Sequence, residues 1–422
     1  MGSLEETIRR WIEPTQYRVL IIPRAKVRHR RVIRRVQENG KANVVFLVSS
    51  LPMWRFQSVY DLLKSDERFS PSIAIYPFPS FGSLQKEEAM TSLRAYFRER
   101  GIAVTDLSQE SFPGQALKDQ LSPDILFFPQ TYNYLYGNDL DNQFFTDSLN
   151  CYIPYSIRTS TGKNVYRSLF NDTAWRLFYP SKLHYLEAKS ILYNKGTNIR
   201  ITGDPIIDLI QTAPEEQVWK PQNKAKKRVI WAPHFSIIDN GIMHRDSFTW
   251  LSECMKEIAN QYQESIQIAF KPHPRLKSEL YALSGWGQEK TDCYYRFWEE
   301  GANTQLETGP YLDLFKESDA MIHDCGSFSI EYLITGKPAL FTTQDVQKSI
   351  AGQNELGQQA ILAHYHGATR EDIQTFIEQT VLGGEDSKID TRKAIYNNYL
   401  QIPGGRSAAE NIYNEILAGL GF

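Results

Sequence analysis

Residues 316–341 read KESDAMIHDCGSFSIEYLITGKPALF and contain a strand, a turn, a helix and the start of a second strand. The apolar segment Ala320–Ile322 predicts the first strand, and His-Asp-Cys-Gly-Ser at 323–327 predicts the turn. A helix is expected over Phe328–Thr335, because the Gly-Lys-Pro sequence that follows cannot continue it. The next strand begins at Ala339. This order is typical of a parallel α/β sheet.

The start of this helix is a candidate anion site. The first backbone N–H groups of a helix have no partner within it and carry the positive end of its dipole. The hydroxyls of Ser327 and Ser329 can add donors at the same place. The predicted phosphate-binding residues here are therefore Gly326, Ser327, Phe328 and Ser329. The alternative is an ordinary capped helix, in which Ser327 only satisfies backbone N–H groups.

Length and composition limit the classes of protein to which the chain can belong. Its 422 residues are more than one hydrophobic core usually supports, so two domains are expected. A hydrophobic content of 41% and a net charge of −2 indicate a globular protein with no general attraction for nucleic acid. Four scattered cysteines indicate reduced thiols rather than a disulfide framework. With no apolar leader and no apolar run of about 20 residues, a cytoplasmic location is expected.

The N-terminal 42 residues form a predicted basic arm. The first 50 residues contain eleven Lys and Arg against four Glu, a net charge of +7. Apolar residues such as Trp11, Val19 and Leu20 lie between the basic ones, so peripheral contact with an anionic membrane is one interpretation. The alternative is a solvated basic helix beside the fold. Nucleic-acid binding is not expected, because the arm offers no aromatic platform for bases.

Two series of alternating strands and helices follow the arm. Residues 43–211 predict an N-terminal Rossmann-like domain, and residues 228–400 predict a C-terminal one. The resemblance described below implies that the first is the acceptor domain and the second the nucleotide-donor domain. A polar, proline-containing linker at 212–227 separates them, and a final helix is expected within 401–422. Ligands of parallel sheets collect at the carboxyl ends of the strands. In the first domain this indicates Ser49, Tyr155 and Ser156.

Polar sequences end three strands of the second series. They are Ala-Pro-His at 232–234, Lys-Pro-His-Pro-Arg at 271–275 and the turn at 323–327. In one parallel sheet these ends share an edge, so Lys271, Arg275 and the two histidines are expected around a common anion. Two prolines fix the backbone on either side of His273, which favours a functional role for it. His234 is the second catalytic candidate, since imidazole titrates near neutral pH.

The residues around this predicted anion site argue against both a metal and a cofactor. His234, His273 and His323 are conceivable zinc ligands, but Lys271 and Arg275 would repel a cation. Neither a Gly-x-Ser-x-Gly elbow, a Walker A sequence nor Gly-x-Gly-x-x-Gly occurs in the chain. No metal and no cofactor are therefore expected.

The sequence resembles the CDP-glycerol glycerophosphotransferase family of teichoic-acid and capsule synthesis. The resemblance spans about residues 43 to 420. The segments that carry it are Thr202-Gly-Asp-Pro205, Trp231-Ala-Pro-His234, Lys271-Pro-His-Pro274, Ser318–Phe328 with Glu331, Gly336-Lys-Pro338 and Gly405–Ala409. It implies an α/β protein of the GT-B type, with two Rossmann-like domains whose parallel sheets face across a cleft.

The resemblance also implies roles for individual residues. The donor would be a CDP-linked polyol phosphate, with His273 at its pyrophosphate, Asp324 and Ser327 in the donor-binding turn, and Glu331 on the helix facing the nucleotide. One departure concerns the acceptor. Typical members carry Trp-His-Gly in the first domain, whereas this chain has Ile-Pro-Tyr-Ser at 153–156, so the base that activates the acceptor stays open.

The leading hypothesis is a transferase that moves glycerol or ribitol phosphate from a CDP-linked donor to a glycan or lipid-linked acceptor. It would work in teichoic-acid or capsule synthesis, at the inner face of the bacterial cell membrane. The same fold also supports an inverting glycosyltransferase that uses a nucleotide sugar, or a sugar-nucleotide epimerase. A non-catalytic scaffold of a polymer-synthesising complex is the alternative from a different class.

Overall fold

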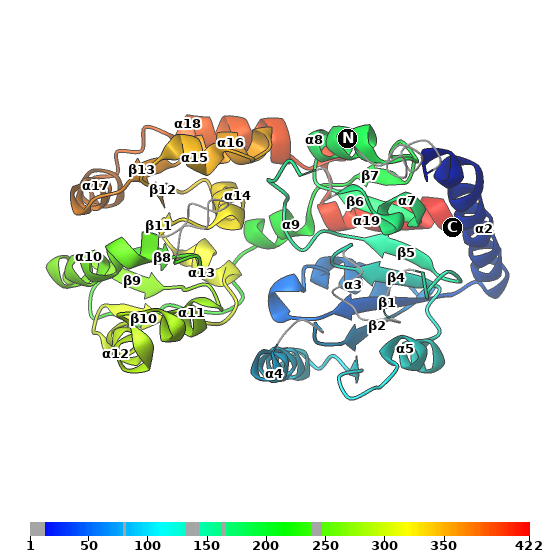
Figure 1. The fold of residues 1–422 in the computed structure, drawn as a ribbon, viewed down its shortest axis with the longest axis horizontal. Helices are drawn as coiled ribbons and strands as arrows, with labels where there is room; N and C mark the ends of the chain where they lie inside the picture. The colour runs from blue at the N-terminus through cyan, green and yellow to red at the C-terminus, as the bar shows by residue number, and fades with distance from the viewer. Residues whose placement is uncertain (1–12, 79–81, 132–139, 141–142, 163–165, 238–246) are drawn as a thin grey trace, which may run out of the picture. The chain divides into compact units, whose positions relative to one another are not determined.

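The computed structural model describes residues 13–78, 82–131, 140, 143–162, 166–237 and 247–422. The chain divides into two compact units (Figure 1). Unit 1 comprises Met1–Ile157, Gly162–Asp208 and Gln401–Phe422, and unit 2 comprises Arg158–Thr161 and Leu209–Leu400. The domain limits expected from the sequence stay predictions.

Unit 1 is built on a parallel sheet of seven strands in the order β3-β2-β1-β4-β5-β6-β7. The order reverses between β1 and β4, which is the arrangement of a doubly wound fold. The strands are β1 (Ala42–Val48), β2 (Phe69–Ile75), β3 (Val104–Asp106), β4 (Ile125–Phe128), β5 (Leu149–Tyr152), β6 (Arg176–Tyr179) and β7 (Ile199–Ile201). The central strands β1 and β4 are almost wholly buried, as their continuous apolar sequences require.

Helices cover the sheet of unit 1. They are η1 (Tyr17–Ile21), α2 (Ile22–Asn39), η2 (Leu51–Met53), α3 (Gln57–Lys64), α4 (Ser83–Glu99), α5 (Pro113–Leu121), α7 (Leu169–Thr173), α8 (Lys182–Ile191) and α19 (Ala408–Leu420). α9 (Pro205–Gln211) lies where the chain passes from unit 1 into unit 2. The core of the unit includes Val44, Phe46 and Phe127.

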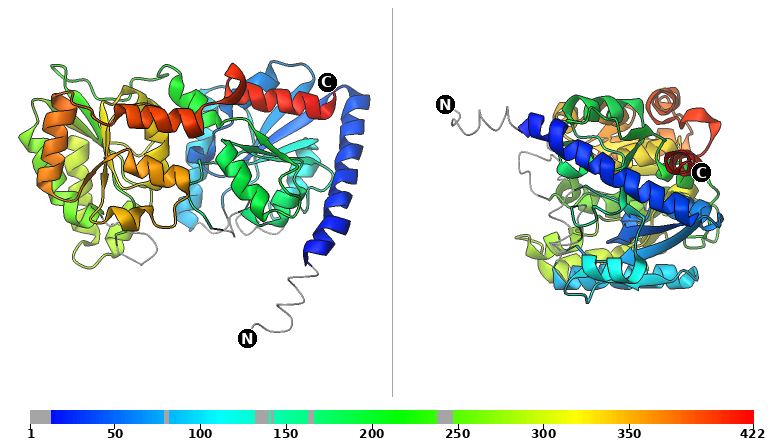
Figure 2. Two further views of the ribbon diagram at one scale, coloured as in Figure 1. Left: turned by 90° about the horizontal axis from the view of Figure 1, so that it is seen from above. Right: turned by 90° about the vertical axis from the view of Figure 1, so that its right-hand side faces the viewer.

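The first and last helices of the chain belong to the same unit. α2 buries Val32 and Val36 in a core cluster that also contains Ile412 and Ile416 of α19. Figure 2 shows α2 in blue and α19 in red, with the end of α19 close to the end of α2. Gln37 Nε2 donates to the carbonyl of Leu420 over 2.6 Å. The basic arm expected from the sequence therefore includes a helix that packs against unit 1.

Unit 2 contains a parallel sheet of six strands in the order β10-β9-β8-β11-β12-β13. The strands are β8 (Lys227–Ala232), β9 (Ile266–Phe270), β10 (Thr304–Leu306), β11 (Ala320–His323), β12 (Ala339–Thr342) and β13 (Tyr365–Gly367). Here the order reverses between β8 and β11. Trp231, Phe270 and Trp298 pack at the centre of its main core cluster.

The helices of unit 2 alternate with these strands. They are α10 (Ser247–Gln261), α11 (Leu276–Ala282), α12 (Gly287–Glu300), α13 (Leu312–Glu317), α14 (Gly326–Ile334), α15 (Val346–Ile350), α16 (Glu355–Leu362), α17 (Arg370–Thr375), η4 (Phe376–Leu382), α18 (Ile389–Ile395) and η5 (Tyr396–Leu400). After them η6 (Pro403–Gly405) returns the chain to unit 1.

The segment expected to be a linker, 212–227, packs against unit 2. Trp219 is buried in a core cluster with Ile230 and Leu314. Lys220 N–H donates to Gln305 Oε1 over 2.8 Å, and Gln267 Nε2 donates to the Lys220 carbonyl over 2.9 Å. The polar composition suggested an interdomain linker, and in the structure one buried tryptophan and its neighbouring amides hold the segment on the sheet of unit 2.

Within the described residues, no helix is both long and apolar enough to cross a membrane.

Candidate functional site

The candidate site lies in unit 2, at the carboxyl ends of β9, β8 and β11. These three strands are neighbours in the parallel sheet, so Lys271, Pro233 and Asp324, which directly follow them, meet at one edge. β8 and β11 also flank the point where the strand order reverses. Open α/β sheets bind their ligands at such a point. The sequence expectation that these strand ends share an edge is confirmed.

Asp324 joins two of these strand ends. Its carboxylate is fully buried and accepts a hydrogen bond from the backbone N–H of His234, over 2.6 Å. Its second oxygen accepts from the hydroxyl of Ser247, at the start of α10, also over 2.6 Å. The first contact holds the backbone of His234, and the second holds the carboxylate itself. Asp324 was expected in the donor-binding turn, and in the structure both of its oxygens accept from protein donors.

His234 and His273 lie side by side, with ring centroids 5.1 Å apart. The Nδ1 atom of each ring accepts a backbone N–H two residues further along the chain. Ser236 N–H donates to His234 over 3.2 Å, and Arg275 N–H donates to His273 over 3.1 Å. A neutral ring that accepts at Nδ1 carries its proton on Nε2. Both imidazoles therefore have Nε2–H as their donor group.

The charge state of His273 follows from its surroundings. Burial, followed by the positive charges of Arg275 and Lys271, lowers the pKa of His273 to about 4. The ring is therefore neutral near pH 7. A negatively charged ligand beside it would reverse this effect, because an opposite charge favours the imidazolium form.

The two cations of Lys-Pro-His-Pro-Arg differ in their contacts. Lys271 is buried, and its ammonium donates to the carbonyl of Gly309 over 2.6 Å. Burial lowers the pKa of Lys271 to about 8, against the raising effect of the Glu307 carboxylate. Arg275 is exposed, and its Cζ atom lies 4.2 Å from the ring centre of Phe235. Its Nη2 atom donates to Glu279 Oε1 over 2.5 Å. Arg275 therefore lies at the surface of the site, whereas Lys271 binds the loop that contains Gly309.

α14 begins at Gly326, directly after the turn that follows β11. No side chain caps this helix at Cys325. Among the described residues, none accepts a hydrogen bond from the backbone N–H groups of Gly326, Ser327 and Phe328. The Ser327 hydroxyl is partly exposed and lies 3.4 Å from the Cys325 thiol. The turn therefore presents backbone and hydroxyl donors together, as an anion requires.

The remaining residues expected on α14 lie deeper. Ser329 is buried and its hydroxyl donates to the carbonyl of Cys325 over 3.3 Å, within the helix itself. The buried carboxylate of Glu331 accepts from the Tyr311 hydroxyl over 2.6 Å. Phe328 packs on the Tyr311 ring, with centroids 5.1 Å apart. Tyr311 was not singled out from the sequence, because an isolated tyrosine in a loop has no local signature.

The residues expected on the acceptor side lie in unit 1. Ser49 directly follows β1, is fully buried, and its hydroxyl has no hydrogen-bond partner among the described residues. Tyr155 is 37% exposed, and its backbone N–H donates to the Pro129 carbonyl that follows β4. Ser156 is partly exposed. β1 and β4 flank the reversal point of the first sheet, so Ser49 and Tyr155 lie at the equivalent edge of unit 1.

In the part of the chain that the structure describes, no group of three His, Cys, Asp or Glu side chains is placed to hold a metal ion. His323, weighed as a zinc ligand in the sequence, is buried with its ring 5.4 Å from that of Phe341.

Solved structures similar to this chain have the GT-B-type fold. The wall teichoic acid polymerase TagF, as an H444N variant soaked with CDPG, matches with a TM-score of 0.57 at 14% identity, covering 100% of this chain and 99% of that chain. UDP-GlcNAc 2-epimerase from Methanocaldococcus jannaschii matches with a TM-score of 0.55 at 14% identity, covering 89% and 99%. MnaA from S. aureus, solved with UDP, gives 0.56 at 14% identity, covering 90% and 97%. At such low identities the likeness concerns the fold.

A family model, in contrast, matches the sequence itself. The model of CDP-glycerol:poly(glycerophosphate) glycerophosphotransferase covers residues 157–418, which is more than half of the chain and includes every strand end of the site in unit 2. A search of curated proteins found no match. The GT-B-type fold expected from the sequence is confirmed, and the chain belongs to the CDP-glycerol:poly(glycerophosphate) glycerophosphotransferase family.

Proposed function

We propose that the edge formed by β8, β9, β11 and the start of α14 binds the diphosphate of CDP-glycerol, and that the protein transfers glycerol phosphate from it. The single observation that carries the proposal is the pair His234 and His273. Their rings lie 5.1 Å apart, and a backbone N–H occupies Nδ1 of each. Two fixed imidazole donors beside an uncapped helix start suit two linked phosphate groups.

The proposed reaction is an in-line displacement at the β-phosphorus. The acceptor hydroxyl oxygen forms a bond to this phosphorus, while the bond to the oxygen bridging the two phosphorus atoms breaks. CMP leaves with that oxygen, and the acceptor proton passes to a base. Negative charge builds up on the leaving oxygen, where hydrogen-bond donors held in place beforehand stabilise it best.

In this proposal His273 donates from Nε2 to the diphosphate. The ring enters the reaction neutral, because its pKa is about 4 in the free protein. The backbone N–H groups of Gly326 and Ser327 add donors at the helix start, and Arg275 contributes positive charge at the exposed side. Glu331, further along α14, accepts a hydrogen bond from Tyr311, which directly precedes α13. We propose that this pair contacts the nucleoside.

The acceptor hydroxyl and the base that takes its proton complete the proposed reaction. His234 stays a catalytic candidate within unit 2. Because its ring accepts at Nδ1 and carries its proton on Nε2, its proposed part is to donate a hydrogen bond to the phosphate, and the base is a different group. The proposed acceptor is a hydroxyl of a glycan, carried on a lipid, and Ser49, Tyr155 and Ser156 stay the predicted contacts in unit 1. A lipid-linked acceptor would place the enzyme at a membrane surface, through its basic N-terminal arm.

The function is tested by following CMP release from CDP-glycerol in the presence of a glycan-lipid acceptor. We expect CMP release by the wild-type protein, a loss on the order of 100-fold or more for His273→Asn, and near wild-type release for His366→Asn. His366 is a suitable control, because it lies on the edge strand β13 with Nε2 at 2.8 Å from the Ile361 carbonyl. Turnover of UDP-GlcNAc without CMP release from CDP-glycerol would contradict the proposal and favour a sugar-nucleotide enzyme.

A further inference from the structure

Three donors converge on the carbonyl oxygen of Cys325, the N-cap residue of α14. The Ser329 N–H makes the usual first bond of the helix to this oxygen, over 3.2 Å. The Ser329 hydroxyl donates to the same atom over 3.3 Å, and Nδ1 of His323 lies 3.2 Å from it. Because a carbonyl oxygen only accepts, the His323 ring carries its proton on Nδ1 and is the third donor.

The peptide group links this oxygen to the candidate anion site. In a planar trans peptide, the C=O and the N–H point in opposite directions. The N–H that shares a peptide plane with the Cys325 carbonyl belongs to Gly326, and it has no acceptor among the described residues. Groups that fix the direction of the Cys325 carbonyl therefore also fix the direction of the Gly326 N–H. Donors on the oxygen also polarise the peptide, which makes its N–H a stronger donor.

His323 is itself held firmly in place. It is the last residue of β11 and is fully buried. Its ring lies almost perpendicular to two others, with its centroid 5.4 Å from that of Phe341, its neighbour on β12, and 5.3 Å from that of His364. A ring enclosed in this way cannot turn without displacing its neighbours. Nδ1 of His323 is therefore kept on the Cys325 oxygen.

From this arrangement we infer that His323 is a positioning residue that aims the Gly326 N–H at the diphosphate of the donor, with the Ser329 hydroxyl as its helper. Both side chains are buried and act through the peptide group between Cys325 and Gly326. The inference rests on the proposed function and deepens it, because it names what holds a donor N–H in place before the ligand arrives. A donor aimed beforehand needs no reorganisation while charge builds up on the phosphate.

His364 shows what a purely structural histidine does on the same helix. It is also fully buried, and its Nε2 lies 3.0 Å from the Ser329 carbonyl, so it too donates to α14. The N–H in that peptide plane belongs to Ile330, the fifth residue of α14. An N–H at that position has a partner within the helix. His364 therefore stabilises α14 without aiming a free donor, and it provides a matched control.

The test observes the Gly326 N–H directly in the full-length protein. Cysteine is followed by glycine at one place in the chain, 325–326. Labelling with ¹³C-carbonyl cysteine and ¹⁵N-glycine therefore gives a single carbonyl-filtered amide signal in the NMR spectrum, which belongs to Gly326. We expect this proton signal to move downfield when saturating CDP is added, because the N–H then donates to a phosphate oxygen. The Kd for CDP is measured by calorimetry on the same proteins.

Three variants separate positioning from packing. His323→Leu keeps most of the buried volume but removes the donor, so it should weaken CDP binding about tenfold and reduce the downfield shift. His323→Asn can place its side-chain N–H where Nδ1 lies, so it should restore the shift and most of the affinity, although its smaller side chain lowers the Tm. Ser329→Ala should weaken binding about threefold, and it keeps the test decisive if His323→Leu does not fold.

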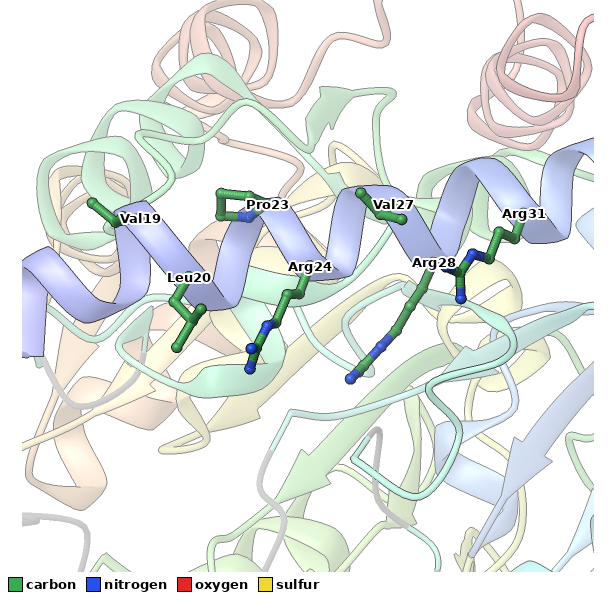
Figure 3. A pocket seen from close by; sticks show the side chains of 7 residues that line it. All are labelled: Val19, Leu20, Pro23, Arg24, Val27, Arg28 and Arg31. Carbon is green, nitrogen blue, oxygen red and sulfur yellow. The ribbon is translucent and has the colours of Figure 1, made fainter.

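Two controls accompany these variants. His364→Leu removes a buried donor to the same helix, so it should lower the Tm about as much as His323→Leu does, with the Gly326 shift and the Kd for CDP unchanged. Arg31→Gln is a remote control on α2 of unit 1. Figure 3 shows its exposed side chain beside a shallow depression of about 290 Å³. This change should alter neither the Gly326 signal nor the Kd for CDP.

Wild-type shift and affinity in His323→Leu would overturn the inference, and so would a His323→Asn variant that binds CDP as weakly as His323→Leu. A Gly326 signal that does not move although CDP binds would also overturn it, while leaving the transfer reaction untouched. CMP release from CDP-glycerol is measured in parallel. A wild-type protein whose Gly326 signal responds to CDP but that releases no CMP would contradict the proposed transfer and leave the positioning role of His323 intact.

Discussion

Single backbone hydrogen bonds decide how the residues of the donor site can act. His273 was expected to be functional because two prolines flank it in Lys-Pro-His-Pro-Arg. The structure adds which ring nitrogen is left for a ligand, since Arg275 N–H occupies Nδ1. That contact depends on the conformation of the turn after β9, which cannot be predicted from the residue types alone. Asp324 is a similar case, because its contacts come from residues 90 and 77 positions away.

Replacing Asp324 with Asn tests its positioning role. Asp324 accepts from His234 N–H and from the Ser247 hydroxyl. In the Asp324→Asn variant the amide nitrogen can only be placed toward Ser247, whose hydroxyl must then accept, and the negative charge that strengthens both hydrogen bonds is lost. We expect Asp324→Asn to lower the free energy of unfolding by about 1–3 kcal/mol and to lower kcat more than it raises KM for CDP-glycerol. Ser247→Ala removes one donor and should cost less. An Asn variant with unchanged stability and kcat would show that the carboxylate does not position His234.

Helix α2 packs against the rest of unit 1 with a partly buried histidine, His29. His29 lies on the side facing unit 1, among charged neighbours. Burial, followed by the charges of Arg176, Arg28 and Lys26, lowers the pKa of His29 to about 4, while a hydrogen bond with the Thr173 backbone opposes this. The sequence indicated a basic helix, but the side that docks could not be read from basic residues distributed all around it.

The lowered pKa of His29 predicts a pH dependence of stability. Between about pH 6.5 and 4 the unfolded chain binds a proton at this ring and the folded chain does not, so stability falls as the pH falls through this range. Above about pH 6.5 the ring is neutral in both the folded and the unfolded chain, so the full contribution of His29 to stability is present there. After allowance for partial exposure we expect a loss of about 1–2 kcal/mol, which His29→Gln should remove. Parallel urea midpoints of the two proteins at pH 4.5 and 7 measure it. An identical pH slope for both would contradict the assignment.

The last helix, α19, completes the core of unit 1 although it follows the whole of unit 2. Ser407 caps it, with its hydroxyl accepting from Glu410 N–H, and Asp208 accepts from the N–H groups of Ala408 and Ala409. The sequence predicted a final helix within 401–422, and α19 confirms it. Its docking place could not be predicted, because the contacts join residues near the two ends of the chain.

Truncating Ile412 tests the packing of α19. This side chain is fully buried in the same cluster as Val36 and Phe46. We expect Ile412→Ala to lower the free energy of unfolding by about 2–5 kcal/mol, through the lost burial and the cavity left behind. Asn414→Ala, at an exposed position of the same helix, should change it by less than about 0.5 kcal/mol. Urea unfolding of the three proteins provides the comparison, and equal midpoints would contradict the packing described.

At the scale of the whole molecule, both units follow one plan, a doubly wound parallel sheet with polar residues where the strand order reverses. The sequence predicted the strands with continuous apolar runs, such as β1, β4 and β9. It missed β5, β6, β10 and β13, whose residues mix apolar with polar types, unlike those of the equally short β4. Such strands are specified by their neighbours in the sheet rather than by their own residues. The candidate site residues follow β8, β9 and β11, which the sequence did predict.

The proposed contact between His273 and the diphosphate of the donor can be measured through the pKa of the His273 ring. The measurement is an NMR titration of ¹⁵N-labelled histidine, assigned with His273→Asn, with and without saturating CDP. In the free protein the pKa should be about 4. With CDP it should rise by at least about one unit, because adjacent phosphate favours the imidazolium form. A pKa of His273 that stays unchanged while the ³¹P signals of CDP shift on binding would contradict the claim.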